Sequence, residues 1–225
     1  MKLLVIVPAY NEEGNIKKLI NNIVKEGHDY LVINDGSTDS TAEILDQNHF
    51  NHLDLVVNIG LAGVAQAGFR YAYNNDYNYA IVIDGDGQHP PKYINDLIKK
   101  TEEGYDYVIG SRFLQEKKPY TLRMLGSRLI SLCLKLTTGQ KITDPTSGMR
   151  IMGRAVLKDF SEDFNYIAEP DALAYLLKKN YRVAEIQVSM RERESGISHF
   201  GSPINSIKYM YSVLMSIIFI QLFRK

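Results

Sequence analysis

The sequence predicts an α/β fold with a mostly parallel β-sheet that helices cover on both faces. Short, continuous apolar runs alternate with helical periodicity through the first 110 residues. Such runs are typical of strands buried on both faces, and their alternation with helices is typical of parallel sheets. Clusters of polar residues follow several of the expected strands, where an open α/β sheet binds its ligands.

The expected elements follow in order along the chain. Strands are expected at 3–7, 30–33, 53–57, 79–83 and 105–109. The acidic Asn11-Glu12-Glu13 stretch favours a helix over 16–24, and further helices are expected from 39 or 40, over 61–73 and after Pro90-Pro91, because proline is tolerated in a first turn. The later pattern indicates helices over 122–137 and 168–179, a polar loop at 144–150, a strand at 182–188, and a helix from 203.

The composition is that of one globular domain. The chain has 225 residues, of which 45% are hydrophobic and 23% charged. Lys plus Arg and Asp plus Glu both total 26, so no global charge favours a nucleic-acid partner. We expect one domain over 1–202 and an added apolar helix over 203–225. The single cysteine, Cys133, lies in an apolar run and is interpreted as a buried thiol.

The strongest chemical signal is Asp84-Gly85-Asp86, directly after a buried strand. Two carboxylates so close would repel one another unless a cation lay between them. Oxygen ligands suit Mg²⁺ or Mn²⁺, and Gln88 could supply another oxygen. The sequence therefore predicts a divalent-cation site at Asp84, Asp86 and Gln88. No phosphate loop and no G-x-G-x-x-G after the first strand are present, which argues against a nucleoside triphosphatase or a dehydrogenase.

The motifs together resemble the family 2 glycosyltransferases, whose fold is the Rossmann-like GT-A fold. The segments that carry this resemblance are Pro8-Ala9-Tyr10-Asn11-Glu12, Asn34-Asp35-Gly36-Ser37, Asn58-Ile59-Gly60, Asp84-Gly85-Asp86-Gly87-Gln88-His89-Pro90-Pro91 and Gly110-Ser111-Arg112. Within the family the chain looks like the dolichol-phosphate-mannose synthase branch, or the polyprenyl-phosphate glycosyltransferases more broadly. The resemblance covers nearly the whole chain. It implies an inverting, metal-dependent transferase that acts at the cytoplasmic face of the cell membrane.

The resemblance also implies roles for single residues. The nucleotide-sugar donor, a UDP- or GDP-sugar, would be bound by Pro8, Tyr10, Glu12, Asp35, Asp84, Gly85, Asp86, Arg193 and Ser198. The acceptor phosphate would face Arg112, Arg123 and Ser127. The residues expected to act directly in catalysis are Asp86, Arg112, Arg123 and Asp144. Residues 144–150 resemble a family segment near the sugar, with Met149 in place of an aromatic residue.

The nature of the acceptor separates two hypotheses. A lipid phosphate is already anionic near neutral pH and needs positive charge rather than a base, which Arg112 and Arg123 would provide. A sugar hydroxyl on a growing cell-wall or capsular glycan would need a general base, for which Asp144 and Glu169 are the candidates. The leading hypothesis is transfer to polyprenyl phosphate. A third hypothesis is a nucleotide-sugar-binding subunit that is active only with a membrane partner.

The C-terminal segment is unusually apolar from 207 to 223 and ends in Arg224-Lys225. Basic residues after an apolar helix suit a helix that lies at an anionic membrane surface. A small membrane protein, packing on the core of the chain itself and contact between two copies are the alternatives, so a homo-oligomer stays open. No run reaches the roughly 20 apolar residues that span a bilayer. We therefore expect a cytoplasmic protein, peripheral at the inner face of the membrane.

Overall fold

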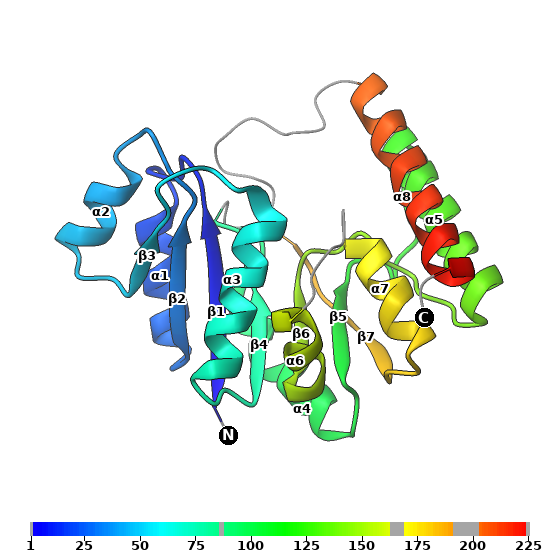
Figure 1. Cartoon of the computed structure of the whole chain (residues 1–225), viewed down its shortest axis with the longest axis horizontal. Helices are drawn as coiled ribbons and strands as arrows, with labels where there is room; N and C mark the ends of the chain where they lie inside the picture. The colour runs from blue at the N-terminus through cyan, green and yellow to red at the C-terminus, as the bar shows by residue number, and fades with distance from the viewer. Residues whose placement is uncertain (1, 86–87, 163–168, 191–202, 224–225) are drawn as a thin grey trace.

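A computed structural model of the chain describes residues 2–85, 88–162, 169–190 and 203–223 (Figure 1). Within these ranges seven strands form one sheet in the order β3-β2-β1-β4-β6-β5-β7. The strands are β1 (Leu3–Ala9), β2 (Asp29–Asn34), β3 (His52–Asp54), β4 (Tyr79–Val82), β5 (Tyr107–Ser111), β6 (Arg150–Gly153) and β7 (Val183–Gln187). Six of them are parallel, and β6 alone is antiparallel to both its neighbours, β4 and β5. The predicted mostly parallel sheet is confirmed.

Strand β6 was not predicted. Its residues were expected to end a polar loop or to lack regular structure, because the strand is only four residues long and begins with an arginine. Arg150, Ile151 and Met152 are nonetheless buried, since β6 is hydrogen-bonded on both sides in the middle of the sheet. The helix that follows it, α6 (Arg154–Glu162), was not predicted either.

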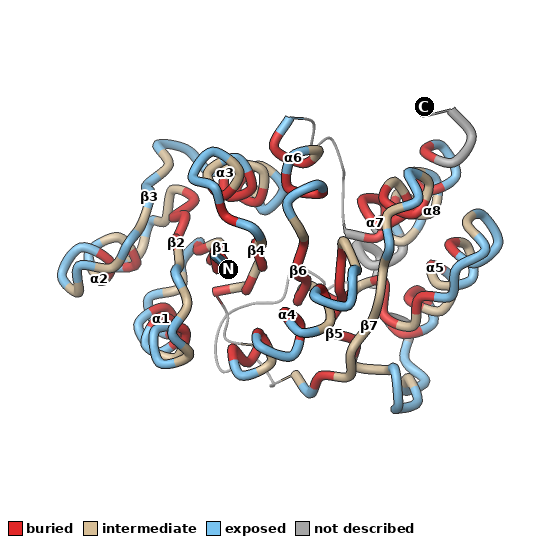
Figure 2. Tube along the Cα trace, turned by 90° about the horizontal axis from the view of Figure 1, so that it is seen from below, coloured by how far each residue is buried: buried red, intermediate tan, exposed pale blue. Residues whose placement is uncertain are grey.

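Helices cover both faces of the sheet, as the alternating pattern predicts (Figure 2). One face packs on α1 (Ile16–Lys25), α2 (Thr41–Gln47) and α4 (Ile94–Glu102), and the other on α3 (Gly60–Asn74), α5 (Leu122–Thr138), α6, α7 (Glu169–Lys178) and α8 (Pro203–Phe223). Strand β1 contributes to both cores, with Leu4 and Ile6 on one face and Val5 and Val7 on the other. Successive side chains of a strand point to opposite faces, so a strand buried on both sides must be apolar throughout.

The C-terminal helix α8 packs beside α5 and α7 (Figure 1). Val213, Ile217 and Ile220 of α8 are buried in the same core cluster as Ile130 and Leu134 of α5. The helix predicted from residue 203 is therefore present, and one of its sides packs on the rest of the chain. No helix in the described part of the chain meets the length and apolarity that crossing a bilayer would require.

The close packing of α3 on β1 gives a stability prediction. A Cβ atom at Gly68 would lie 2.5 Å from Cγ2 of Ile6, a fully buried residue of the central strand. Gly68→Ala should lower the free energy of unfolding by about 1–3 kcal/mol, measured by urea denaturation. The destabilisation by overpacking exceeds the stabilisation from the better helix propensity of alanine.

Gly63→Ala on the same helix is the matched control. Its Cβ would meet only the side chain of Ile59, which is 48% exposed and free to move. An equal or greater loss of stability in Gly63→Ala would contradict the packing argument.

Candidate active site

The predicted site residues that the structure describes converge on the edge of the sheet where the parallel strands have their carboxyl ends. Strands β1 and β4 lie side by side at the centre, and the chain runs outward from β1 through β2 to β3. The connections after β1, β2, β4 and β5 therefore meet at this edge, at the point where the strand order reverses.

The antiparallel strand β6 brings one more segment to the same edge. Because β6 runs against its neighbours, the residues before it, 144–149, lie beside the carboxyl ends of β4 and β5. The sequence suggested this segment as part of the site by resemblance alone. The direction of β6 supplies the physical reason.

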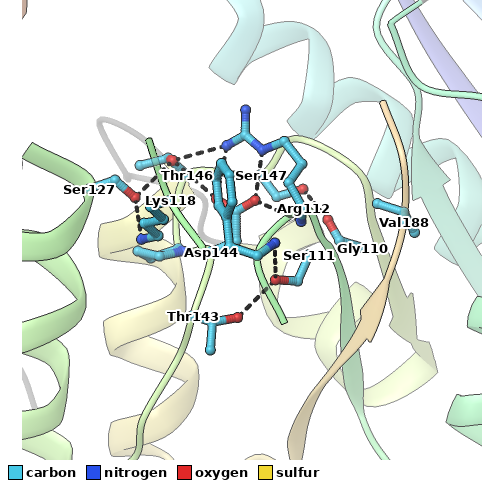
Figure 3. Close-up of polar contacts among 12 residues, drawn as sticks. Gly110, Ser111, Arg112, Lys118, Ser127, Thr143, Asp144, Thr146, Ser147 and Val188 are labelled. Carbon is cyan, nitrogen blue, oxygen red and sulfur yellow. Dashed lines mark hydrogen bonds and ion pairs between the residues drawn. The ribbon is translucent and has the colours of Figure 1, made fainter. Parts of the chain in front are cut away.

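A buried ion pair joins this segment to the end of β5 (Figure 3). Asp144 is fully buried, and its two carboxylate oxygens accept from Nε and Nη2 of Arg112 at 2.7 and 2.8 Å. Burial alone would raise the pKa of Asp144, but the hydrogen bonds and positive charge of Arg112, with a contribution from Lys118, hold that pKa below its ordinary value. Asp144 is therefore a bound carboxylate that orients Arg112, and a weak proton acceptor.

Glu185 of β7 fixes the backbone on which this pair depends. Its carboxylate accepts from the backbone N–H of Thr143 and of Asp144 at 2.7 and 2.8 Å, and from the Thr143 hydroxyl at 2.8 Å. The sequence analysis did not identify Glu185. The available signal was a single acidic residue in the otherwise uncharged strand Val183–Gln187.

Hydroxyl and amine groups extend from the ion pair toward α5 (Figure 3). Thr146 Oγ1 lies 3.3 Å from Arg112 Nη2 and 3.4 Å from the Ser127 hydroxyl. Ser127 is buried and accepts from Nζ of Lys118 at 2.8 Å. The expected acceptor residues Arg112 and Ser127 are thus brought together. Lys118, which the sequence analysis missed, reaches Ser127 from the loop before α5.

The described part of the acidic motif lies beside β1. Asp84 follows β4, and its backbone N–H donates to Nδ1 of the buried His89 at 3.3 Å. A Cβ at Gly85 would lie 2.9 Å from the backbone oxygen of Pro8, and one at Gly148 would lie 3.2 Å from Oδ2 of Asp84. These glycines permit the close approach of three separate loops around the Asp84 carboxylate, whose side chain is 38% exposed.

The loops after β1 and β2 are held to each other by hydrogen bonds. The backbone N–H groups of Asn11 and Glu12 donate to the hydroxyls of Ser37 and Thr41 at 3.0 and 2.8 Å. Tyr10, expected in the nucleotide pocket, is 46% exposed beside this junction. The arrangement leaves an aromatic ring exposed at this edge of the sheet.

Asp35 has a structural role that the sequence did not indicate. It is buried, and its two oxygens accept from the backbone N–H groups of Ile59 and Gly60 at 2.7 and 2.9 Å. These N–H groups belong to the N-cap residue and the first residue of α3, so Asp35 holds the start of that helix. A contact between Asp35 and the base of the donor stays a prediction.

Two residues of the 144–150 segment serve the core. Met149 is fully buried in the apolar cluster. Arg150 is also buried and donates to the backbone oxygens of Ser147 and Pro145 and to the Tyr107 hydroxyl. Arg150 therefore supports the backbone of the segment from beneath.

Several predicted site residues lie outside the described residues. They are Asp86, Arg193 and Ser198; in addition, the side chains of Arg123 and Glu169 are not described. Among the described residues, no group of three or more His, Cys, Asp or Glu side chains gathers as a metal site would. Asp84 and Gln88 are the described members of the expected metal set.

Comparison with known proteins identifies a family. The model of glycosyl transferase family 2 matches residues 4–161. Similar proteins include the UDP-N-acetylglucosamine–dolichyl-phosphate N-acetylglucosaminyltransferase of Methanococcus voltae, 28% identical over 95% of each chain. They also include an undecaprenyl-phosphate 4-deoxy-4-formamido-L-arabinose transferase of Proteus mirabilis, 29% identical over 95% of this chain and 67% of the relative.

A solved structure shares the fold. Glucosyl-3-phosphoglycerate synthase from Mycobacterium tuberculosis, in complex with Mn²⁺, UDP and glucosyl-3-phosphoglycerate, superposes with a TM-score of 0.72. The match covers 98% of this chain and 79% of that one at 17% sequence identity.

The Asp144–Arg112 pair gives a prediction on stability and its pH dependence. Asp144→Asn should lower the free energy of unfolding by about 3 kcal/mol at neutral pH, because it leaves a largely buried guanidinium without its charge partner. The pKa of Asp144 is lowered in the folded chain, so its contribution is complete above the unfolded value of about 4 and is lost as pH falls through the folded pKa. The difference in the free energy of unfolding between wild type and variant, measured by urea denaturation, should therefore shrink below about pH 4.

Asp76→Asn is the matched control, since Asp76 pairs with Arg154 at 2.9 Å but is 87% exposed. It should change stability by at most about 1 kcal/mol. An Asp144→Asn effect as small as that of the control would contradict the role assigned to the buried pair.

Proposed function

The chain belongs to glycosyl transferase family 2, and we propose that it moves a sugar from a nucleotide-diphosphate sugar to a polyprenyl phosphate. The observation that carries this proposal is the acceptor side of the site. There Arg112, Ser127 and Lys118 gather within hydrogen-bonding reach of one another through Thr146 and Asp144. Cations and hydroxyls of this kind suit a phosphate.

The chemistry of the acceptor favours a phosphate over a sugar hydroxyl. A hydroxyl must lose its proton to a base as it attacks, whereas a phosphate oxygen already carries the charge. Asp144, the described candidate base, has both oxygens on Arg112 and a lowered pKa, so it accepts a proton poorly. The names of the two relatives, a dolichyl-phosphate and an undecaprenyl-phosphate transferase, support the same acceptor class.

In the proposed mechanism the chain binds and orients the acceptor on one side of residues 144–149 and holds the donor on the other side. Arg112, locked by Asp144, turns its Nη1 away from that pair; within the described residues this nitrogen makes no hydrogen bond and is available to the acceptor phosphate (Figure 3). Arg123 and Ser127 would complete the phosphate site. The phosphate oxygen then displaces the nucleoside diphosphate from the sugar, and the configuration at the sugar carbon inverts.

The donor side would hold Mg²⁺ or Mn²⁺ through Asp84, Asp86 and Gln88. The residues fit such an ion, since they offer only oxygen ligands and Asp84 lies exposed between glycines that admit close approach. When bound, the ion neutralises the charge that develops on the departing diphosphate. Pro8, Tyr10, Glu12, Asp35 and Gly85 would line the nucleotide pocket, and Arg193 and Ser198 would lie on the donor. The Methanococcus voltae relative, named for UDP-N-acetylglucosamine, makes this sugar nucleotide the first donor to test.

We propose that the protein acts as a peripheral protein at the inner face of the cell membrane. Helix α5, which carries Ser127, has an exposed stripe of leucines on one side: Leu125, Leu129, Leu132 and Leu136. Helix α8, packed beside it, exposes Tyr211, Met215, Ile218 and Phe219. Two adjacent apolar stripes next to the acceptor residues suit the surface of the bilayer in which a polyprenyl phosphate is dissolved.

The experiment that tests the function uses the purified chain with radiolabelled UDP- and GDP-sugars. Undecaprenyl phosphate in detergent, or a glycan, serves as the acceptor. We expect label in the organic phase with the lipid phosphate, lost on addition of EDTA and restored by Mn²⁺. Asp86→Asn should abolish turnover while the chain stays folded, because it removes a ligand of the proposed ion.

Each contrary result points to a different alternative. Product that forms only with the glycan would favour transfer to a sugar hydroxyl. Product that forms only after membrane extract is added would favour a subunit that depends on a partner. Full activity of Asp86→Asn would remove the proposed metal role.

The membrane assignment gives its own prediction. The double variant Leu132→Glu/Phe219→Glu places a charge on each stripe and should weaken sedimentation with anionic liposomes by about tenfold or more, since each large apolar side chain contributes about 2 kcal/mol when buried. Val24→Glu on α1 is the control, because Val24 is equally exposed, at 52%, but belongs to a helix on the opposite face of the sheet. Equal liposome binding by all three proteins would contradict the assignment.

A further inference from the structure

Lys118 is a half-buried cation that the sequence motifs do not account for. It lies in the segment between β5 and α5, and its side chain is partly buried. Its Nζ donates to the Ser127 hydroxyl at 2.8 Å (Figure 3). It also donates to the Ser131 hydroxyl at 3.4 Å. Both serines are on α5, one turn apart.

The amine has no acidic partner at ion-pair distance among the residues that the structure describes. Burial lowers the pKa of Lys118; Asp144 acts in the opposite direction, and Arg112 and Arg128 lower it further. The two carboxylates that act on this amine are already engaged, Asp144 by Arg112 and Glu185 by Thr143 and the Asp144 backbone. A partly desolvated ammonium among other cations is unfavourable unless an anion joins it.

The position of Lys118 is fixed by Arg128. The Arg128 guanidinium donates to the backbone oxygens of Lys118 and Pro119 at 2.6 and 3.2 Å. It also lies over the ring of Tyr120, 4.8 Å from the ring centre. Arg128 is therefore a positioning residue that clamps the loop onto α5. The clamp holds the amine against Ser127, where a flexible surface lysine would extend into solvent.

We propose that Lys118 is a direct ligand of the acceptor phosphate, which it binds together with Ser127 and Arg112. This inference rests on the proposed function and deepens it. The phosphate monoester brings a charge of about −1.5 to −2 and three acceptor oxygens, enough for two cations and a hydroxyl at once. The ammonium exchanges its neutral hydroxyl partners for charged oxygens, and the uncompensated charge is neutralised when the acceptor binds.

The test compares Lys118→Met, Lys118→Arg and Lys117→Met in the transfer assay, each with acceptor and donor concentrations varied separately. Loss of one charged hydrogen bond should raise the KM for undecaprenyl phosphate about 10- to 100-fold in Lys118→Met. The KM for the nucleotide-sugar should stay unchanged. Lys118→Arg should recover most of the acceptor affinity, and Lys117→Met, an exposed neighbour, should behave as wild type.

The binding of decyl phosphate, measured by calorimetry in the absence of donor, separates this inference from the proposed function. If wild type transfers sugar to the lipid phosphate but Lys118→Met keeps the same acceptor KM, or changes both KM values alike, the role of Lys118 is overturned and the function stands. If wild type transfers no sugar to lipid phosphate yet binds decyl phosphate in a Lys118-dependent way, the phosphate site stands and the function falls. Wild type that neither transfers nor binds overturns both.

Discussion

The site depends on one buried carboxylate. Asp144 has no exposed surface, and its two hydrogen bonds to Arg112 join the start of the β6 connection to the end of β5. Burial makes the charge costly alone and the attraction strong once paired, so the pair specifies one orientation of the guanidinium. Glu185 supports it by accepting hydrogen bonds from two consecutive backbone N–H groups, those of Thr143 and Asp144. The cation proposed to bind the acceptor phosphate is thereby positioned before any substrate arrives.

The same segment contacts the other half of the site. Four residues after Asp144, Gly148 lies against Asp84 and His89, so closely that a side chain there would displace them. One stretch of backbone therefore touches the residues proposed for the donor and those proposed for the acceptor. In a transfer reaction the two reactants must be held at a fixed separation, and a shared rigid segment achieves this more simply than two independent loops.

Sequence patterns predicted what depends on local chemistry. Apolar runs located six of the seven strands, and the polar motifs after β1, β2 and β4 pointed to the edge of the sheet where these loops meet, because buried parallel strands and their terminal loops leave a signature in consecutive residues. Strand β6 was not predicted because its burial comes from neighbours that are distant in the chain. Lys118 and Glu185 were not predicted for the same reason, because each acts through a partner on another element. Lys118 contacts Ser127 on α5, and Glu185 contacts Thr143 before β6. The roles of Asp86, Arg193 and Ser198 are proposals drawn from family resemblance.

The place of β6 in the sheet has a consequence for biosynthesis. β6 separates β4 from β5 in space but follows both along the chain. A polypeptide that has left the ribosome only as far as residue 149 can pair β1 with β2 and β4, yet β5 has no neighbour to join it to them. The half proposed to bind the donor can consolidate early. The half proposed to bind the acceptor waits until Arg150–Gly153 pairs with both β4 and β5, a late and long-range event of the kind that slows folding.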